Sequence, residues 1–449
     1  MPGLPAPLAP PYVWTGTGNY PAGANLWDGQ PLALQPAGTY FTPNTKPSPE
    51  EFNFLLAGYA AQLVALQGYI ASFAALNWTP QCAISTMPGS GANAPKSFLD
   101  ACWNAALGEW FVAINSVAST RTVVYSTSGQ DWTTTTSQVG STFPFFDMAS
   151  LACSWTGDVW MATSYNDGVN QDKVNFYHYT SGAWSAAETI SLSPPNASVT
   201  RPRLKQFTTS AGVECIIYAI GNTSTAGHGT GYNPIGSNRG GTFAGGAIDP
   251  GGLANDFVIA TNAPAVGVHQ WNVAPIAIVM PRDTNVASYY LQYQTTSDCI
   301  TWTQRTFPGV NTAAAYVKDI VWTQDVTGPC FLAAVYAPGS NTTIFYRSAD
   351  GISWYQGATV SAFPISEMEA CGALIVATLQ DNGSGGGSST AYSTDGGATW
   401  HPATGSFTTS ATDNSYMRPM VRTNNTGFVM MNNNWLRFSA NAGQPPATY

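Results

Sequence analysis

Charged side chains are scarce in this sequence. Lys and Arg number 15 and Asp and Glu 24, so charged residues make up 9% of the 449 residues, where a soluble domain usually carries about 25%. The surface must therefore be wetted by uncharged polar side chains and by backbone. Because affinity for nucleic acid comes mainly from Lys and Arg, the net charge of −9 argues against DNA or RNA as a partner.

Motifs for metals, cofactors and disulfides are also missing. The seven cysteines are odd in number, widely spaced and without a C-x-x-C pair, which indicates neither a disulfide framework nor a zinc site. Cys102, Cys153, Cys330 and Cys371 lie in apolar, strand-like runs, where we expect buried thiols and folding in a reducing cytoplasm. The four histidines share no metal-ligand spacing, and Walker, G-x-S-x-G and H-E-x-x-H patterns are absent. The sequence thus predicts no metal and no cofactor.

Hydrophobic residues at 44% and aromatic residues at 12% are ample for a large core, so the chain is predicted to fold. Residues 1–47 differ from the rest, because they are rich in Pro and Gly and show no sustained period. This extended arm is either disordered or, as its scattered aromatics favour, laid onto another surface. It lacks the basic and apolar regions of a secretory signal.

A helix is predicted over residues 48–76. Ser48, Pro49 and Glu51 form an N-cap, a first helical position and a capping box. The helix has no charged residue after Glu51, but its Asn, Gln and Ser residues make a membrane span the weaker interpretation. We expect it to pack against another helix. That helix belongs either to another copy of the chain, with a trimer favoured, or to the chain's own domain. Apolar residues at alternating spacings of three and four form the seam of the predicted helix: Leu56, Tyr59, Leu63, Leu66, Ile70 and Phe73.

From residue 77 the sequence repeats a strand ending in Tyr, a Ser/Asp/Gly turn and a Trp. The tryptophans are 132, 184, 302, 354 and 400, separated by 52, 118, 52 and 46 residues, so one degenerate repeat lies near 240–260. A second set of residues precedes these tryptophans by 29 to 32 positions: Trp103, Trp155, Trp271, Trp322 and Cys371. Units of roughly 50 residues with four short strands are typical of propeller blades.

Closure of the ring is predicted from Trp78, which lies 54 residues before Trp132. The last unit, near residues 417–443, ends without a turn-Trp strand, and residues 77–81 would supply it and remove an open sheet edge. The prediction is an all-β protein: a β-propeller over residues 77–449, with seven four-stranded blades, or six as the alternative.

One turn carries a specific resemblance. Residues 393–400 fit the pattern S-x-D-x-G-x-T-W and resemble the Asp-box, or BNR repeat, of sialidase-like propellers. Two other copies are degenerate. The copy before Trp132 has Ser128 at the Asp position, and the copy before Trp302 has Ser297 at the Asp position and Cys299 at the Gly position. We expect these turns to be structural, with each Trp packing on the next blade. The residues concerned are Ser393, Asp395, Gly397, Trp400, Asp350, Trp354, Trp132 and Trp302.

Residues 26–63 resemble the leading segment of bacteriophage tail-fibre and virion proteins, through the passage "YFTPNTKPSPEEFNFLL". The resemblance implies a virion structural protein made in the host cytoplasm, a tail fibre or another particle-attached fibre or receptor-binding component. It would contact other virion proteins through residues 1–76. Head, tail and baseplate locations stay open.

Rare charged residues recur near the first strand of successive units: Asp100, Asp147, Arg203, Asp319, Glu367, Glu369 and Arg418. Because innermost strands run parallel around a propeller, these side chains are predicted to gather at one mouth of its channel. They are either charges tolerated at wet strand starts, a pocket for a polar ligand or glycan, or paired carboxylates of a glycosidase. We predict a protein that binds a host glycan or protein without cutting it. A sialidase-like glycoside hydrolase or a secreted glycan-binding propeller is the alternative.

Overall fold

The structure is a computed structural model, and the chain divides into two units, residues 1–75 and 76–449. The predicted arm and the predicted helix, with its seam, lie outside the described residues. Within the described part of the chain, no helix is long and apolar enough to cross a membrane. The structure describes residues 78–88, 95–116, 122–135, 148–164, 173–185, 188–191, 199–222, 235–238, 244–245, 254–262, 274–284, 292–308, 315–325, 327–379, 389–402, 420–424, 427–432 and 435–439.

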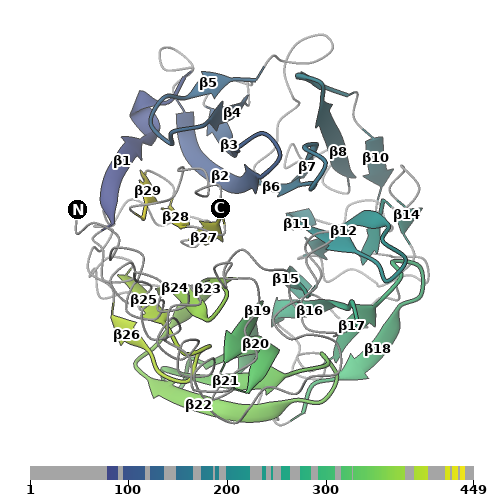
Figure 1. Ribbon diagram of the computed structural model, residues 1–449, viewed down its shortest axis with the longest axis vertical. Helices are drawn as coiled ribbons and strands as arrows, with labels where there is room; N and C mark the ends of the chain where they lie inside the picture. The colour runs from purple at the N-terminus through teal and green to yellow at the C-terminus, as the bar shows by residue number, and fades with distance from the viewer. Residues whose placement is uncertain are drawn as a thin grey trace, which may run out of the picture. The chain divides into compact units, whose positions relative to one another are not determined.

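The second unit is a β-propeller whose described strands form seven antiparallel sheets arranged in a ring (Figure 1). The first sheet contains β2 (Pro95–Asn104), β3 (Glu109–Ser116), β4 (Thr122–Ser126) and β5 (Thr133–Thr134). The second contains β6 (Met148–Cys153), β7 (Val159–Ser164), β8 (Lys173–Thr180), β9 (Ala183–Trp184) and β10 (Glu188–Ser191). The third contains β11 (Val199–Thr208), β12 (Glu214–Asn222), β13 (Ile235–Ser237) and β14 (Ala244–Gly245).

The remaining sheets follow the same order, with the first strand of each nearest the centre (Figure 1). The fourth contains β15 (Ala254–Thr261), β16 (Ala277–Thr284), β17 (Gln292–Thr296) and β18 (Thr303–Thr306). The fifth contains β19 (Tyr316–Asp325), β20 (Gly328–Ala337), β21 (Thr342–Ser348) and β22 (Tyr355–Ser361). The sixth contains β23 (Ile365–Cys371), β24 (Leu374–Leu379), β25 (Ser389–Ser393) and β26 (His401–Pro402).

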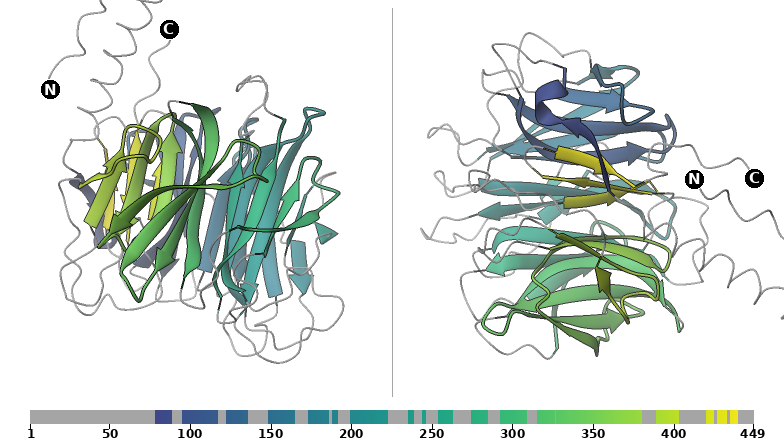
Figure 2. Two further views of the ribbon diagram at one scale, coloured as in Figure 1. Left: turned by 90° about the horizontal axis from the view of Figure 1, so that it is seen from below. Right: turned by 90° about the vertical axis from the view of Figure 1, so that its left-hand side faces the viewer.

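The seventh sheet joins the two ends of the ring. It contains β27 (Met420–Thr423), β28 (Phe428–Met431) and β29 (Trp435–Phe438), and its outer strand is β1 (Thr79–Ala83), followed by the 3-10 turn η2 (Ile84–Thr86). Thr79 pairs with Phe438, and Figure 2 shows β1, in purple, beside the yellow strands from the far end of the chain. The pairing predicted from the spacing of Trp78 is therefore present.

Apolar side chains fill the spaces between neighbouring sheets, and the repeated tryptophans contribute to this packing. The Trp354 Nε1 donates to the Tyr293 hydroxyl at 3.1 Å, and the Trp400 ring stacks on Phe345 at 4.9 Å. Trp132 lies against Phe438 of the seventh sheet. Each Trp therefore packs on the preceding sheet, and the prediction that it packs on the next one was wrong. The reason is that the turns before them lie against the earlier sheet, where Gly129 approaches the Phe438 side chain and Gly397 that of Leu332.

The turns before these tryptophans share one set of hydrogen bonds. The carboxylate of Asp395 accepts the amides of Ala398 and Thr399, both at 2.9 Å, and Asp350 accepts equivalent amides at 2.8 and 2.7 Å. In the copy before Trp302 the accepting carboxylate is Asp298. The assignment of Ser297 to this position was wrong, because that turn has the shorter form of the Asp350 copy.

The shorter turn also places Cys299 where the Asp350 copy has Gly351. Both residues are in the left-handed region, with φ of 61° and 71° respectively. In the copy before Trp132, the Ser128 hydroxyl accepts two amides, both at 3.1 Å, as predicted for a Ser at the Asp position. A hydroxyl therefore replaces a carboxylate without loss of the turn.

The cysteines differ from the sequence prediction at two positions. Cys102 of β2 and Cys153 of β6 form a disulfide, with a Cα–Cα distance of 6.1 Å. The expectation of free thiols there was wrong, because the fold brings together two strands whose separation along the chain gives no disulfide signal. Cys330 is a buried thiol, as predicted, whereas the thiol of Cys371 is only half-buried.

Candidate functional site

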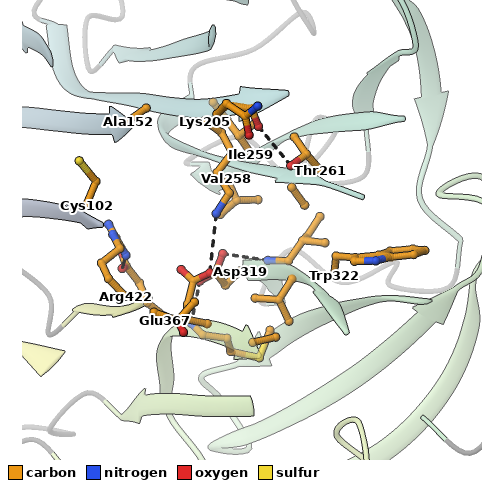
Figure 3. Close-up of a pocket in the computed structure, with 18 of the residues that line it drawn as sticks. Cys102, Ala152, Lys205, Val258, Ile259, Thr261, Asp319, Trp322, Glu367 and Arg422 are labelled. Atoms are coloured by element: carbon orange, nitrogen blue, oxygen red, sulfur yellow. Dashed lines mark hydrogen bonds and ion pairs between the residues drawn. The ribbon is translucent and has the colours of Figure 1, made fainter. Parts of the chain in front are cut away.

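Each innermost strand places one polar side chain at a corresponding position along the channel. Equivalent contacts between neighbouring sheets define this level: the Leu151 amide donates to Asp100 at 2.9 Å, and the Met368 amide donates to Asp319 at 2.7 Å. We call this set the polar ring: Asp100, Ser150, Arg203, Asp256, Asp319, Glu367 and Arg422. Figure 3 shows Asp319, Glu367 and Arg422 among the side chains that line the channel.

Irregular strand pairing aims several of these side chains at the channel. The register shifts immediately before Asp100, Asp319 and Glu367 in the pairing of the first strand with the second. A bulge of this kind turns a side chain away from the face that its position would otherwise give it. Apolar neighbours therefore pack between sheets while the polar residue faces the channel.

Ion pairs join the polar ring across the channel. The Glu367 side chain, only 2% exposed, accepts from Arg203 at 3.0 Å, Arg282 at 3.2 Å and Arg422 at 3.0 Å. Arg282 comes from β16, opposite Asp256. Because these strands belong to different sheets, the pairs close the channel at this level. Burial of ion pairs costs desolvation, so we expect the network to fix the register of the sheets more than to add stability.

The remaining carboxylates are held in the same way. Arg203 donates to both oxygens of Asp256, at 2.9 and 2.7 Å, and Arg422 donates to Asp100 at 3.1 and 2.7 Å. Burial opposes the charge of Arg203, but Asp256 and Glu367 hold its pKa above the ordinary value. The guanidinium group of Arg203 therefore stays charged.

Asp319 differs from the other carboxylates. Burial, together with the nearby charge of Glu367, raises the pKa of Asp319 to about 6. Its two oxygens accept the amides of Ile320 and Met368, at 2.9 and 2.7 Å. With Arg282, the polar ring holds four carboxylates and three guanidinium groups, so it carries one negative charge when all are ionised and becomes neutral when Asp319 takes a proton.

A cavity of about 380 Å³ extends from the polar ring toward the far ends of the innermost strands. The paired cysteines, Gln206 and Thr261 line its wall. Lys205 and Glu369 face each other from β11 and β23, with 3.7 Å between Nζ and Oε1, and their side chains are 42% and 17% exposed. Two sheets lie between those strands in the ring, so this loose ion pair spans the channel above the polar ring.

Five of the seven predicted site residues line this cavity: Asp100, Arg203, Asp319, Glu367 and Glu369. Asp147 and Arg418 lie outside the described residues.

Sequence reasoning missed four charged residues of the site: Lys205, Asp256, Arg282 and Arg422. Lys205 lies two residues after the predicted Arg203 on the same strand. Arg422 lies in the described strand β27 (Met420–Thr423), four residues after Arg418, so the register of the last unit could have identified it. Asp256 is the last residue of a Gly-rich, low-complexity stretch at 221–256, in which the repeat could not be recognised. Arg282 lies on a second strand, where the search for strand starts gave no signal.

The chemistry available is that of polar side chains. Among the described residues, no group of three or more His, Cys, Asp and Glu could hold a metal ion. Each carboxylate of the polar ring accepts hydrogen bonds from backbone amides or from arginine. The fold and site together define a β-propeller with a closed, polar channel.

Comparisons with known proteins find similar solved structures only. No family model matches the chain, and no curated protein matches it. A fungal lectin of Aleuria aurantia, described as a six-bladed β-propeller with a novel fucose recognition mode, is similar with a TM-score of 0.40 and 14% identity, over 71% of this chain and 99% of the lectin.

Two further solved structures are similar at the same level. The α-L-arabinanase of Penicillium chrysogenum, complexed with arabinobiose, has a TM-score of 0.43 and 10% identity, over 81% of this chain and 98% of its own. AofleA of Arthrobotrys oligospora has a TM-score of 0.36 and 10% identity, over 73% and 96% of the two chains. These similarities concern the fold alone.

Proposed function

We propose that this protein is a carbohydrate-binding β-propeller that holds a neutral sugar in its channel and does not cut it. The observation that carries the proposal is the cavity above the polar ring, with its closed, charge-paired floor and its exposed Lys205–Glu369 pair. Such a cavity offers many hydrogen-bonding groups in a small space, which is what a polyhydroxylated ligand needs.

The wall groups match hydroxyls, which donate and accept. The Lys205 ammonium supplies up to three donors and the Glu369 carboxylate only acceptors. Their separation of 3.7 Å exceeds the roughly 2.8 Å of a strong charge-assisted hydrogen bond. A sugar hydroxyl placed between them would therefore exchange a loose contact for two shorter ones.

The charge of the site favours a neutral ligand over an acidic one. The guanidinium groups of the polar ring are already bonded to carboxylates, and the ring has an excess negative charge when Asp319 is ionised. The carboxylate of a sialic or uronic acid would meet repulsion in a site of low dielectric constant. This argues against the sialidase-like alternative.

A hydrolase remains the second candidate because of Asp319. Its raised pKa is the property expected of a general acid, and glycosidases pair such a group with an ionised carboxylate. Binding without turnover is nevertheless favoured, because the neighbouring Glu367 is fully engaged with three arginines.

The test is binding of the full chain to an array of neutral, amino and acidic mono- to tetrasaccharides. We expect binding to a neutral glycan, an affinity about tenfold lower in Glu369→Gln, and no release of reducing sugar. Glu188→Gln, on the outer strand β10, is the matched control and should bind normally. Absence of binding, or sugar release that Asp319→Asn abolishes, would contradict the proposal.

The resemblance of residues 26–63 to phage proteins supports a second part of the proposal. In it, the propeller is the host-contacting module of a virion fibre, attached to the particle and trimerised through residues 1–76. This part rests on the sequence alone, and its experiment is given in the Discussion.

A further inference from the structure

The turn between β6 and β7 presents a tryptophan to solvent. The Trp155 side chain is 43% exposed, and its position differs from that expected from the sequence repeat, which grouped it with the strand residue Trp103. Trp103 pairs with Trp110 within the first sheet, whereas Trp155 lies in the turn beyond the end of β6. The indole therefore stands beyond the end of an innermost strand.

This turn is held from both neighbouring sheets. The Trp155 amide donates to Glu214 of the third sheet at 2.9 Å. From the first sheet, the Asn104 side chain donates to the Gly157 carbonyl at 2.6 Å and accepts the Leu107 amide at 3.2 Å. Leu107 is itself 50% exposed. The contacts give Trp155 a fixed backbone and place a second apolar side chain on the adjoining turn.

The turn is also continuous with the cavity. Cys153, two residues before Trp155, lines the cavity wall. On the other side, Glu214 accepts a hydrogen bond from the Gln206 side chain, and Gln206 lines the cavity as well. Trp155 is thus connected to the cavity wall on two sheets: along the chain through Cys153, and by hydrogen bonds through Glu214 and Gln206.

The size of the cavity leaves part of a longer ligand outside. At about 380 Å³ it lies at the low end of the range for small-molecule sites, roughly 300–1,000 Å³. A glycan chain whose end occupies the cavity must continue past the ends of the innermost strands. The apolar C–H face of a sugar ring packs well on an indole, which buries a large area without losing many rotamers.

We propose that the site takes an oligosaccharide, with its terminal residue in the channel cavity and a following residue packed on Trp155. This inference rests on the proposed function, because it extends the same site outward. It assigns Trp155 to a subsite that selects for chain length, with Glu214 and Leu107 at its edges.

The experiment is calorimetric titration of the full chain with the tightest-binding neutral oligosaccharide of the array and with its terminal monosaccharide. We expect Trp155→Ala to weaken the oligosaccharide about tenfold and to leave the monosaccharide unchanged. Trp155→Phe should retain most of the affinity. Tyr355→Ala, at a side chain 71% exposed on the outer strand β22, is the control and should change neither.

The possible failures are distinguishable. If the wild-type chain binds the oligosaccharide no more tightly than the monosaccharide, or if Trp155→Ala binds both normally, the subsite is wrong while glycan binding stands. An equal loss in Tyr355→Ala would also overturn the subsite, since the effect would not be local. If no sugar binds at all, the proposed function fails and the subsite with it.

Discussion

Replacing Trp78 with Ala tests whether the strand at residues 79–83 is needed to close the ring. Trp78 is only 6% exposed, and its carbonyl lies 3.5 Å from the Arg437 guanidinium. A buried Trp covers 150–250 Å², which at 25 cal/mol per Å² is worth roughly 4–6 kcal/mol. Truncations of buried Trp to Ala cost about 3–5 kcal/mol. We expect a loss of about 4 kcal/mol in the free energy of unfolding.

The loss is large against the roughly 5–15 kcal/mol that stabilises a typical domain. Urea unfolding followed by far-UV circular dichroism measures it without relying on tryptophan fluorescence. Trp155→Ala is the matched control, because the same substitution at a residue that is 43% exposed removes much less buried area and should cost clearly less than the loss at Trp78. Equal effects of the two substitutions would refute the argument from burial.

Truncation gives a second measure of closure. A chain starting at residue 76 keeps β1, whereas one starting at residue 89 lacks β1 together with the buried Ile84 and Met87. We expect cooperative unfolding of the first and none of the second, which would expose β29 as an open edge. If both chains melted alike, pairing of β1 with β29 would be dispensable.

Two further predictions concern the turns and the N-terminal segment. Burial tends to raise the pKa of Asp395, but hydrogen bonds from Thr399, Ser393 and Ala398 hold it below the usual value. The ionised Asp395 therefore stabilises the folded state above about pH 4, and this contribution is lost as the pH falls through the lowered pKa. Asp395→Ala should therefore cost about 1–2 kcal/mol at pH 7 and much less at pH 2, by urea unfolding; a constant difference would contradict this. For residues 1–76, mass spectrometry of purified virions should detect the chain, and Leu63→Asp with Ile70→Asp should reduce a trimeric mass in light scattering. Absence from virions, or an unchanged mass, would remove the respective part of the proposal.

The architecture was accessible from the sequence because its signals are local. A Tyr, a tight turn and a Trp recur at nearly constant spacing, since every sheet needs the same turn and the same contact with its neighbour. Trp78 revealed closure for the same reason, because it is the missing member of that series. The direction of Trp packing could not be read in this way, since it depends on how the sheets stack.

The site could be predicted in part. Asp100, Arg203 and Glu367 stood out because charge is rare in this chain and because innermost strands share a direction. Their pairing could not be predicted, since it joins sheets that are far apart in sequence. The same holds for the disulfide between Cys102 and Cys153, which depends on the side-by-side placement of β2 and β6.

The pairing of β1 with β29 has a further consequence for loop entropy. Trp78 and Arg437 are 359 positions apart, so closing the ring restrains nearly the whole of the propeller unit, residues 76–449. The entropic cost of closure grows only logarithmically, and exceeds that of a 50-residue loop by roughly 2 kcal/mol. Contacts of such long sequence separation nevertheless slow folding. The seventh sheet should therefore complete its pairing last during folding, and it is the place where the ring can open while the other six sheets keep their internal hydrogen bonds.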